Sequence, residues 1–397
     1  MEGHPHVSDI VITGLGLVTP FGRGVRPYWN GLLEGRSVLA PAPDFGAPSY
    51  RGEPVGRVPR ADEASPRTPG AARTPRKSGY ARVATAEALR AAGLSAVPRD
   101  ALVVLAGQAP ACPAHQPSDA TGEASQAGAV TADLDEFFGP GPVETMGPDL
   151  ARDRVVHLSH ACATAAFAVD FARAALRAGL APVAVVAGSS VLNRYEYASM
   201  SVVRAVSPAA ARPFDVGRAG VSIGEGAGAV VLETARHARA RGRAADLVVA
   251  GAACGVAGGK AASDTGLITA CMRDALDDAA VDRVDLVHAH ATGTVQGDAA
   301  ELAALEAVAG GRDPLPVSSH KGAIGHLLHA SGVPALAAAA LSLRTGIVPP
   351  TPGLGTPEHT DRVLLPTAPL SVPTARVAAV NSFGFGGNNA TLVLRHN

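Results

Sequence analysis

Short, unbroken apolar runs are the feature that most constrains how this chain folds. Each run is about one strand long, and glycine, proline or charged residues flank it. Such runs are typical of strands buried on both faces, because a strand with one wet face alternates apolar and polar residues. The core they predict is built from Ala, Val and Leu, since 47% of residues are hydrophobic but only 4% are aromatic. The runs lie at 9–20, 100–106, 155–158, 182–188, 229–233, 246–253, 284–288 and 391–394.

Helical patterns alternate with these strands. Short amphipathic or Ala-rich segments are expected at 28–35, 79–93, 267–280 and in the stretches after residues 162 and 326. This alternation predicts an α/β fold with parallel strands. Residues 39–75 are rich in Pro, Gly and Arg and are expected to form an irregular surface excursion. Residues 108–148 are interpreted as a long loop with one helical turn near 134–138, and loops of that length are usually either functional or poorly ordered.

The order of elements starts again near residue 241. The strand at 246–253 corresponds to the opening strand, and the helix at 267–280 corresponds to 79–93. The segment 316–344 repeats the strand-then-helix form of 155–176. We therefore predict a duplicated α/β unit, with halves 1–240 and 241–397 packed as one pseudo-symmetric domain.

Composition excludes several classes of function. A net charge of −1 gives no reason to expect a nucleic-acid or membrane partner. No apolar run is long enough to span a bilayer and the first residues lack a signal-peptide layout, so a cytoplasmic protein is expected. The four cysteines have no CxxC spacing, which argues against both a disulfide framework and a metal site. The Gly14–Gly16 pair lacks the third glycine of a dinucleotide-binding loop, and Pro20 follows too soon.

Cys162 is the first candidate catalytic residue. It follows a short apolar run and lies at or just before the first turn of a predicted helix, where free N–H groups and the helix dipole favour a thiolate. Ala161 and Ala163 keep its surroundings narrow, so a substrate can approach the sulfur. The alternative is that Cys162 is a small core residue, as unpaired cysteines commonly are.

Three later clusters lie at predicted strand ends, where open α/β sheets place reactive groups. The first is His290 in HATGT, followed by Asp298 and Glu301 at helical spacing. The second is Lys321, five residues before His326, in a chain whose only other lysines are Lys77 and Lys260. The third is NSFGFGG at 381–387, interpreted as a Gly-rich loop before the last strand.

Together these motifs resemble the β-ketoacyl synthases of the elongating type, the decarboxylating condensing enzymes of type II fatty acid and polyketide synthesis. The resemblance rests on Cys162 in ACATA, His290 in HATGT, the Lys321–His326 spacing and NSFGFGGNN, and it extends to IVITGLGLVTPFG, RPFD and GEGAGAVVLE. It implies a thiolase-like fold in αβαβα layers. It also implies acyl carrier protein as partner, acyl and malonyl thioesters as substrates, a homodimer or a heterodimer with a ketosynthase-like subunit, and no resident cofactor, because phosphopantetheine arrives on the carrier.

The resemblance further implies a role for each motif residue. Cys162 would take the acyl chain as a thioester, and the N–H groups of Cys162 and Phe385 would form the oxyanion hole. His290 and His326 would stabilise the enolate that forms as CO2 leaves, a task that needs neutral or donating imidazoles. The remaining roles are Lys321 hydrogen-bonded within this set, Glu301 as its charge partner, Asp298 and Phe383 in support, Thr292 and Thr294 on the pantetheine arm, and Phe385 as a gate.

Some residues depart from the family pattern. Ala291 replaces the usual glycine after the first histidine, and His160 stands where a small hydroxyl residue is commoner. Pro334 and Ala335 stand where the family usually has a glutamate. Residues 108–148 do not resemble the family. These departures favour a specialised biosynthetic enzyme over housekeeping fatty acid elongation.

Five rival functions follow from related folds. A thiolase would need a second cysteine in the C-terminal loop, and an initiating synthase would carry asparagine in place of His326. A chain-length factor would lack Cys162. An acyltransferase without decarboxylation, or a non-catalytic subunit of a heterodimer, stays an open alternative.

Overall fold

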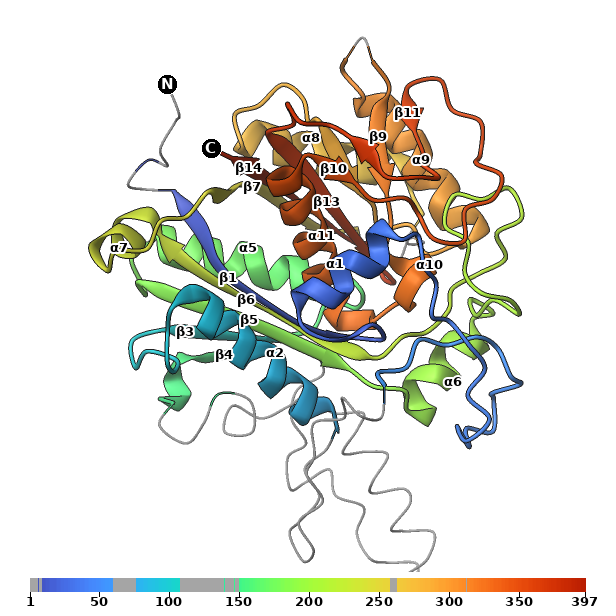
Figure 1. The fold of residues 1–397 in the computed structure, drawn as a ribbon, viewed down its shortest axis with the longest axis horizontal. Coiled ribbons are helices and arrows are strands. Elements are labelled where there is room, and N and C mark those ends of the chain that lie inside the picture. Colours follow the sequence, from blue (N-terminus) through green and yellow to red (C-terminus); the bar gives the residue numbers. More distant parts are fainter. Residues whose placement is uncertain are drawn as a thin grey trace, which may run out of the picture.

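The computed structural model describes residues 6, 9–59, 76–107, 139, 146, 150–257, 263–311 and 313–397. One continuous path of paired strands runs through these ranges in the order β11-β9-β8-β13-β14-β7-β1-β6-β5-β3-β4 (Figure 1). The strands are β1 (Ile10–Thr19), β3 (Leu102–Ala106), β4 (Val155–Leu158), β5 (Val183–Ser190), β6 (Gly226–Thr234), β7 (Leu247–Val256), β8 (Leu286–His288), β9 (Leu315–Ser318), β11 (Val363–Leu364), β13 (Val377–Gly384) and β14 (Asn388–His396). The short β2 (Gly22–Arg23) pairs with β1, and β10 (Ile347–Val348) pairs with β12 (Leu370–Ser371).

Two series of five strands, one that starts at β1 and one that starts at β7, have the same pairing pattern. From β1 the path goes antiparallel to β6, antiparallel to β5, parallel to β3 and parallel to β4. From β7 it goes antiparallel to β14, antiparallel to β13, parallel to β8 and parallel to β9. The two series meet at β1 and β7, where Val11 stands opposite Val248. The repeated order of elements expected from the sequence is therefore present, and the boundary at 240/241 stays a prediction.

Helices form layers between and outside the two strand series (Figure 1). α5 (Thr164–Arg177) and α11 (Gly332–Thr345) contact strands of both series, whereas α2 (Arg76–Ala92) covers β1, β6 and β5, and α8 (Thr265–Asp278) covers β7 and β14. This is the predicted αβαβα arrangement. The other helices are α1 (Val25–Leu33), α6 (Arg194–Val202), α7 (Ala235–Ala240), α9 (Val295–Val308), the single turn α10 (Lys321–Ile324), and the 3-10 turns η3 (Arg152–Arg154) and η4 (Leu328–Ala330).

Small residues allow the layers to approach closely. A methyl group added to Gly14 would lie 2.0 Å from the carbonyl oxygen of Ala88, and one on Gly16 would lie 2.0 Å from that of Ala84. Both contacts are with α2, so this glycine pair permits helix-on-strand packing, in agreement with the exclusion of a dinucleotide-binding loop. No helix among the described residues is both long and apolar enough to cross a membrane.

Several boundaries differ from the sequence-based predictions. The prediction of a loop at 381–387 is wrong in its first part. Residues 381–384 are the end of β13, and the turn is confined to 385–387. The Asn381 side chain, which suggested a loop, is buried and paired, since the Thr391 hydroxyl donates to its Oδ1 at 2.9 Å. The helix predicted at 79–93 begins three residues earlier, and residues 39–59 are irregular as expected. The helical turn expected at 134–138 lies outside the described residues.

Candidate active site

Cys162 lies on a sharp turn between β4 and α5. Ala161 has a left-handed backbone with φ of 47°, a conformation that is strained for a residue with a side chain. The Thr164 hydroxyl holds the turn: it accepts from the N–H of His160 at 2.7 Å and donates to the carbonyl of Ala161 at 2.6 Å. The sequence therefore folds into a strand, a strained turn and a helix, with a Cys162 side chain that is only 8% exposed.

The end of β13 lies directly against this turn. A methyl group added to Gly384 would be 2.8 Å from the backbone nitrogen of Cys162 and 3.1 Å from the Ala161 Cβ. Only glycine permits this approach without movement of one backbone. The contact brings the C-terminal motif, with Phe383 and Phe385 on either side of Gly384, to the nucleophile candidate.

His290 begins a loop whose backbone N–H groups are hydrogen-bonded to side chains of α9. The Glu301 carboxylate accepts from the N–H groups of His290 at 2.8 Å and Ala291 at 2.7 Å. Asp298, one turn earlier on the same helix face, accepts from the N–H groups of Thr292 and Gly293. The helical spacing of Asp298 and Glu301 thus fixes the backbone of HATGT, and Asp298 also accepts from the N–H of Phe214 in RPFD at 2.9 Å.

His326 is held by its backbone, so its ring is available to a ligand. Its N–H donates to the carbonyl of Ser222 at 2.8 Å, and its carbonyl accepts from Gly224 at 2.9 Å. The side chain is 1% exposed, and neither ring nitrogen has a hydrogen-bond partner among the described residues. The His290 and His326 rings meet edge to face with centroids 5.5 Å apart. A buried ring nitrogen without a hydrogen-bond partner destabilises the fold unless a ligand or water forms a hydrogen bond to it.

Lys321 lies behind His290 and is 1% exposed. Its ammonium donates to the backbone carbonyl of His290. The predicted partner Glu301 acts on Lys321 through its charge, which favours the protonated ammonium, but its oxygens are taken by the His290 and Ala291 N–H groups and by Asn381. Lys321 is therefore bonded within the predicted set, although the contact is with a carbonyl.

One small cavity of about 90 Å³ brings most of the predicted site residues together. Lys321, Asp298 and Glu301 stand behind its wall. Phe385 is 49% exposed, and Phe383 is buried with its ring centroid 5.6 Å from that of His290. The cavity is lined by Cys162, Met200, Ala205, Val221, Ser263, His290, Thr292, Thr294, Gly297, His326, Phe383, Gly384 and Phe385.

Burial governs the protonation of these groups. Burial and the Lys321 charge hold the pKa values of His290 and His326 well below the usual value, so both imidazoles are neutral. Burial lowers the pKa of Lys321 to about 8. Burial also raises the pKa of Cys162 to about 11, with the Lys321 charge opposing the rise. The expectation of a resting thiolate is therefore wrong: removal from water outweighs the helix N-terminus.

The sequence reasoning missed a buried histidine pair beside this site. His288 Nε2 and His320 Nδ1 are 2.9 Å apart, and both side chains are almost fully buried. Ser318 and Ser331 extend the chain of polar contacts on either side, at 3.4 and 3.5 Å. The sequence held two signals for this pair, because each histidine is close to a motif residue. His288 is two residues before His290, and His320 directly precedes Lys321.

The departures from the family pattern also have a place in the structure. His160 stacks on Phe167 with centroids 4.1 Å apart, and its Nδ1 lies 3.3 Å from Asn388 Oδ1. Where the family usually has a glutamate, the carbonyl of Pro334 accepts from the hydroxyl of the buried Tyr28 at 3.0 Å. The Ala291 carbonyl accepts from Ser319 at 2.9 Å, and its methyl group is buried.

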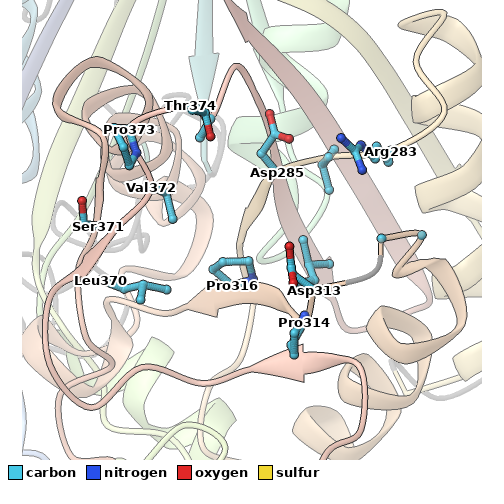
Figure 2. A pocket seen from close by; sticks show the side chains of 15 residues that line it. Arg283, Asp285, Asp313, Pro314, Pro316, Leu370, Ser371, Val372, Pro373 and Thr374 are labelled. Atoms are coloured by element: carbon cyan, nitrogen blue, oxygen red, sulfur yellow. The ribbon is translucent and has the colours of Figure 1, made fainter.

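A larger cavity, of about 710 Å³, lies elsewhere in the C-terminal part of the chain (Figure 2). Its charged lining residues are Arg283, Asp285 and Asp313, and Asp285 is already bonded to the N–H groups of Arg376 and Val377. Among its described lining residues there is no cysteine, no histidine and no predicted site residue. Within the described ranges, no three histidine, cysteine or acidic side chains gather as a metal site requires.

Comparison with known proteins places this geometry in a family. Residues 7–238 match the beta-ketoacyl synthase N-terminal domain and residues 245–354 match the beta-ketoacyl synthase C-terminal domain. The chain is 32% identical to "3-oxoacyl-[acyl-carrier-protein] synthase 2" of Rhizobium meliloti (strain 1021), over 97% of this chain and 98% of the relative. It is 31% identical to "Granaticin polyketide putative beta-ketoacyl synthase 1" of Streptomyces violaceoruber, over 97% of each.

The fold agrees with these matches. The solved structure of the ishigamide ketosynthase/chain length factor superposes with a TM-score of 0.79 at 26% identity, over 98% of this chain and 99% of that one. A thiol on a strained turn, two neutral imidazoles facing the same cavity and a sheet path that occurs twice are all accounted for by one assignment. The chain belongs to the β-ketoacyl synthase family, whose members are acyltransferase-type condensing enzymes.

Proposed function

We propose that this chain joins an acyl group on Cys162 to a malonyl unit by decarboxylative Claisen condensation, with the residue roles given below. The observation that carries the proposal is that Cys162, His290 and His326 line one cavity. A sulfur nucleophile and two neutral hydrogen-bonding rings at one wall are what the two half-reactions need.

In the first half-reaction the Cys162 sulfur attacks the carbonyl carbon of an acyl thioester. The new carbon–sulfur bond forms as the bond to the carrier's pantetheine thiol breaks, and the cysteine proton passes to the leaving thiol. The N–H groups of Cys162 and Phe385 receive the oxyanion. Gly384 supports this role because it allows the Phe385 segment to approach the cysteine backbone.

In the second half-reaction the bond between the malonyl carboxylate and its α-carbon breaks, and CO2 leaves. The electron pair forms an enolate whose oxygen is stabilised by N–H groups of His290 and His326. Neutral rings suit this step because they donate hydrogen bonds to the enolate oxygen without adding a positive charge. Such a charge would stabilise the malonyl carboxylate and oppose the loss of CO2. The α-carbon then attacks the Cys162 thioester, a carbon–carbon bond forms, and the released cysteine sulfur takes one proton.

The partner in both steps is an acyl carrier protein that presents the acyl and malonyl groups on phosphopantetheine. Thr292 and Thr294 line the cavity and contact the arm; their hydroxyl oxygens are 3.1 Å apart. The chain works as a dimer, either with itself or with a ketosynthase-like subunit. The similarity to polyketide as well as fatty acid synthases, with the substitutions at Ala291 and Ala335, supports a specialised pathway.

The test compares wild type with Cys162→Ala, using acyl- and malonyl-carrier protein and following CO2 and the condensed product. Wild type should release CO2 and form β-ketoacyl product, with a mass adduct on Cys162, and the variant should form neither adduct nor product. Acyl transfer without CO2 release would favour the acyltransferase alternative. Absence of any adduct in wild type would favour a non-catalytic subunit.

A further inference from the structure

One face of α6 reaches the Cys162 cavity and also carries a buried carboxyl group. Met200 lines the cavity, and Glu196 is four residues earlier, so the two side chains lie one turn apart on the same helix face. Met200 is 7% exposed and Glu196 is 5% exposed. A buried carboxyl group therefore lies one helical turn from an apolar side chain that lines the cavity.

Glu196 belongs to a cluster of polar groups that is itself buried. The Lys77 ammonium lies 3.4 Å from its carboxylate, and the Asn193 side-chain amide donates to it. His329 Nδ1 lies 3.8 Å from the same carboxylate. The Lys77 side chain is only 1% exposed, which is unusual for lysine, and Lys77 is one of three lysines in the chain. We refer to Lys77, Glu196 and His329 as the polar floor.

A second element brings the polar floor to the same end of the cavity. His329 lies in η4, three residues after His326, and its neighbour Leu328 packs in one apolar cluster with Met200 and Val221. Met200 and Val221 line the cavity themselves. Two segments far apart in sequence, α6 and η4, thus place ionisable side chains behind the same apolar wall.

The polar floor is within electrostatic reach of the sulfur. Burial raises the pKa of Cys162, and the Glu196 charge raises it further. An acyl chain attached to this sulfur that extends past Met200 would meet the Lys77–Glu196 ion pair and the His329 imidazole, whose pKa burial lowers to about 4. Hydrocarbon cannot hydrogen-bond to them, and any separation of the Lys77–Glu196 pair leaves buried charges without compensation.

We infer that the polar floor of Lys77, Glu196 and His329 ends the acyl cavity, and that it restricts the acyl group on Cys162 to short chains or to longer chains that end in a hydrogen-bonding group. This inference rests on the proposed function, because it needs an acyl group on Cys162. It names the substrate class: short or terminally hydroxylated acyl thioesters, and not long saturated ones.

The first experiment uses the wild-type full chain and pantetheine thioesters of acetyl, butyryl, octanoyl, dodecanoyl and ω-hydroxyoctanoyl groups. The rate of the mass adduct on Cys162 is measured for each. Butyryl should load about tenfold or more faster than octanoyl, in the range by which a pocket discriminates chains that differ by a few methylenes. The ω-hydroxyoctanoyl group should recover most of that loss.

The second experiment removes the charges in pairs, since loss of one partner would leave the other unpaired. In Lys77→Met/Glu196→Leu the octanoyl rate should rise about tenfold toward the butyryl rate. The matched control is Arg241→Met/Glu233→Leu, which removes another ion pair with a fully buried carboxylate. Glu233 lies near the far end of β6, about 23 Å along the strand from the Gly226 that meets Leu327, and its profile should be that of wild type.

Met200→Ala keeps the inference testable if the double variant does not fold. This change widens the cavity but leaves the polar floor, so octanoyl should stay slow and ω-hydroxyoctanoyl should gain. Octanoyl loading equal to butyryl in Met200→Ala would show that the bulk of Met200 sets the limit, and would overturn the inference.

Two further results would also overturn it. One is equal loading of all saturated chains by wild type, which leaves the proposed function intact. The other is an unchanged chain-length profile in the folded double variant. No adduct with any acyl group would instead remove the proposed function, and this inference with it.

Discussion

The connections that lead into α5 and α11 occupy equivalent places in the two strand series but carry different chemistry. Residues 159–163, after β4, form a short strained turn with one reactive group, the Cys162 thiol. Residues 319–331, after β9, include α10 and η4 and carry Lys321 and His326. The longer connection carries a buried ammonium and a ring that lines the cavity, whereas the short one brings the Cys162 sulfur to the same cavity. In the proposed mechanism, one architecture that is used twice separates covalent attachment from charge stabilisation.

His326→Ala should give the largest separation between the two connections. The adduct on Cys162 should form within a few-fold of the wild-type rate, while condensation should fall about 10²- to 10⁴-fold, as expected for loss of a positioned proton-donating group. Adduct formation and CO2 release are measured in the same samples. His359→Ala, at an exposed site in the same half, serves as control. An equal loss in both steps would break the division of labour.

Gly384→Ala tests the contact that joins the two connections. The added methyl group would lie 2.8 Å from the Cys162 nitrogen, so the turn must shift and the oxyanion donors with it. We expect adduct formation to slow by about 10²-fold, the lower range for loss of one such donor. Gly255→Ala is the matched control, because nothing lies within 4 Å of the added atom. Loading at the control rate would mean that the nucleophile does not depend on β13.

Lys321→Met tests whether the C-terminal connection tunes the thiol. The Lys321 charge lowers the pKa of Cys162, so its removal should raise that pKa and slow iodoacetamide alkylation several-fold near pH 8. The pKa of Lys321 is about 8, so the ammonium is present below that pH and is lost above it. Wild-type alkylation should therefore rise less steeply with pH above about 8 than in the variant. Arg344→Met controls for loss of a remote charge; the same alkylation profile in all three proteins would disprove the coupling.

Substitution of the His288–His320 pair should have the smallest effect on rate. These rings connect the end of β8 to the start of α10, so they position His290 and Lys321 without touching the cavity. Each change to Asn should lower condensation by less than tenfold. A double-mutant cycle on unfolding free energy should show a coupling of about 1 kcal/mol, within the range for residues in contact. His157→Asn, on β4, should show no coupling with His320→Asn.

Most of the fold was predictable because the strands are buried on both faces and therefore read as unbroken apolar runs. The repeated order of elements followed from those runs and the Ala-rich helices between them, whereas the αβαβα layers were expected only from the resemblance to the β-ketoacyl synthases. The end of β13 was not predictable, because Asn381 and Ser382 are buried in the sheet and the Asn381 amide is hydrogen-bonded there. Glycine and polar letters resemble a loop when such partners are unknown.

Which site residues line one cavity was predictable from motifs, but their protonation was not. The Cys162 thiol was expected to be acidic from its place before a helix, whereas its burial dominates. Glu301 does favour the protonated Lys321 ammonium through its charge, as expected, but its oxygens are bonded to backbone N–H groups whose positions the sequence does not reveal. The His288–His320 pair and the polar floor are contacts between distant segments, which only the tertiary structure brings together.

The junction of β1 and β7 has a consequence for the molecule as a whole. Val11 and Val248 stand opposite each other where the two strand series meet, and α5 and α11 each pack against both series. Neither half could carry out the reaction alone. If the halves were separated, each would expose an unpaired edge strand and an apolar helix face, and each would contain only some of the site residues. The union of the two strand series is what brings Cys162 from one series into the same cavity as His290 and His326 from the other.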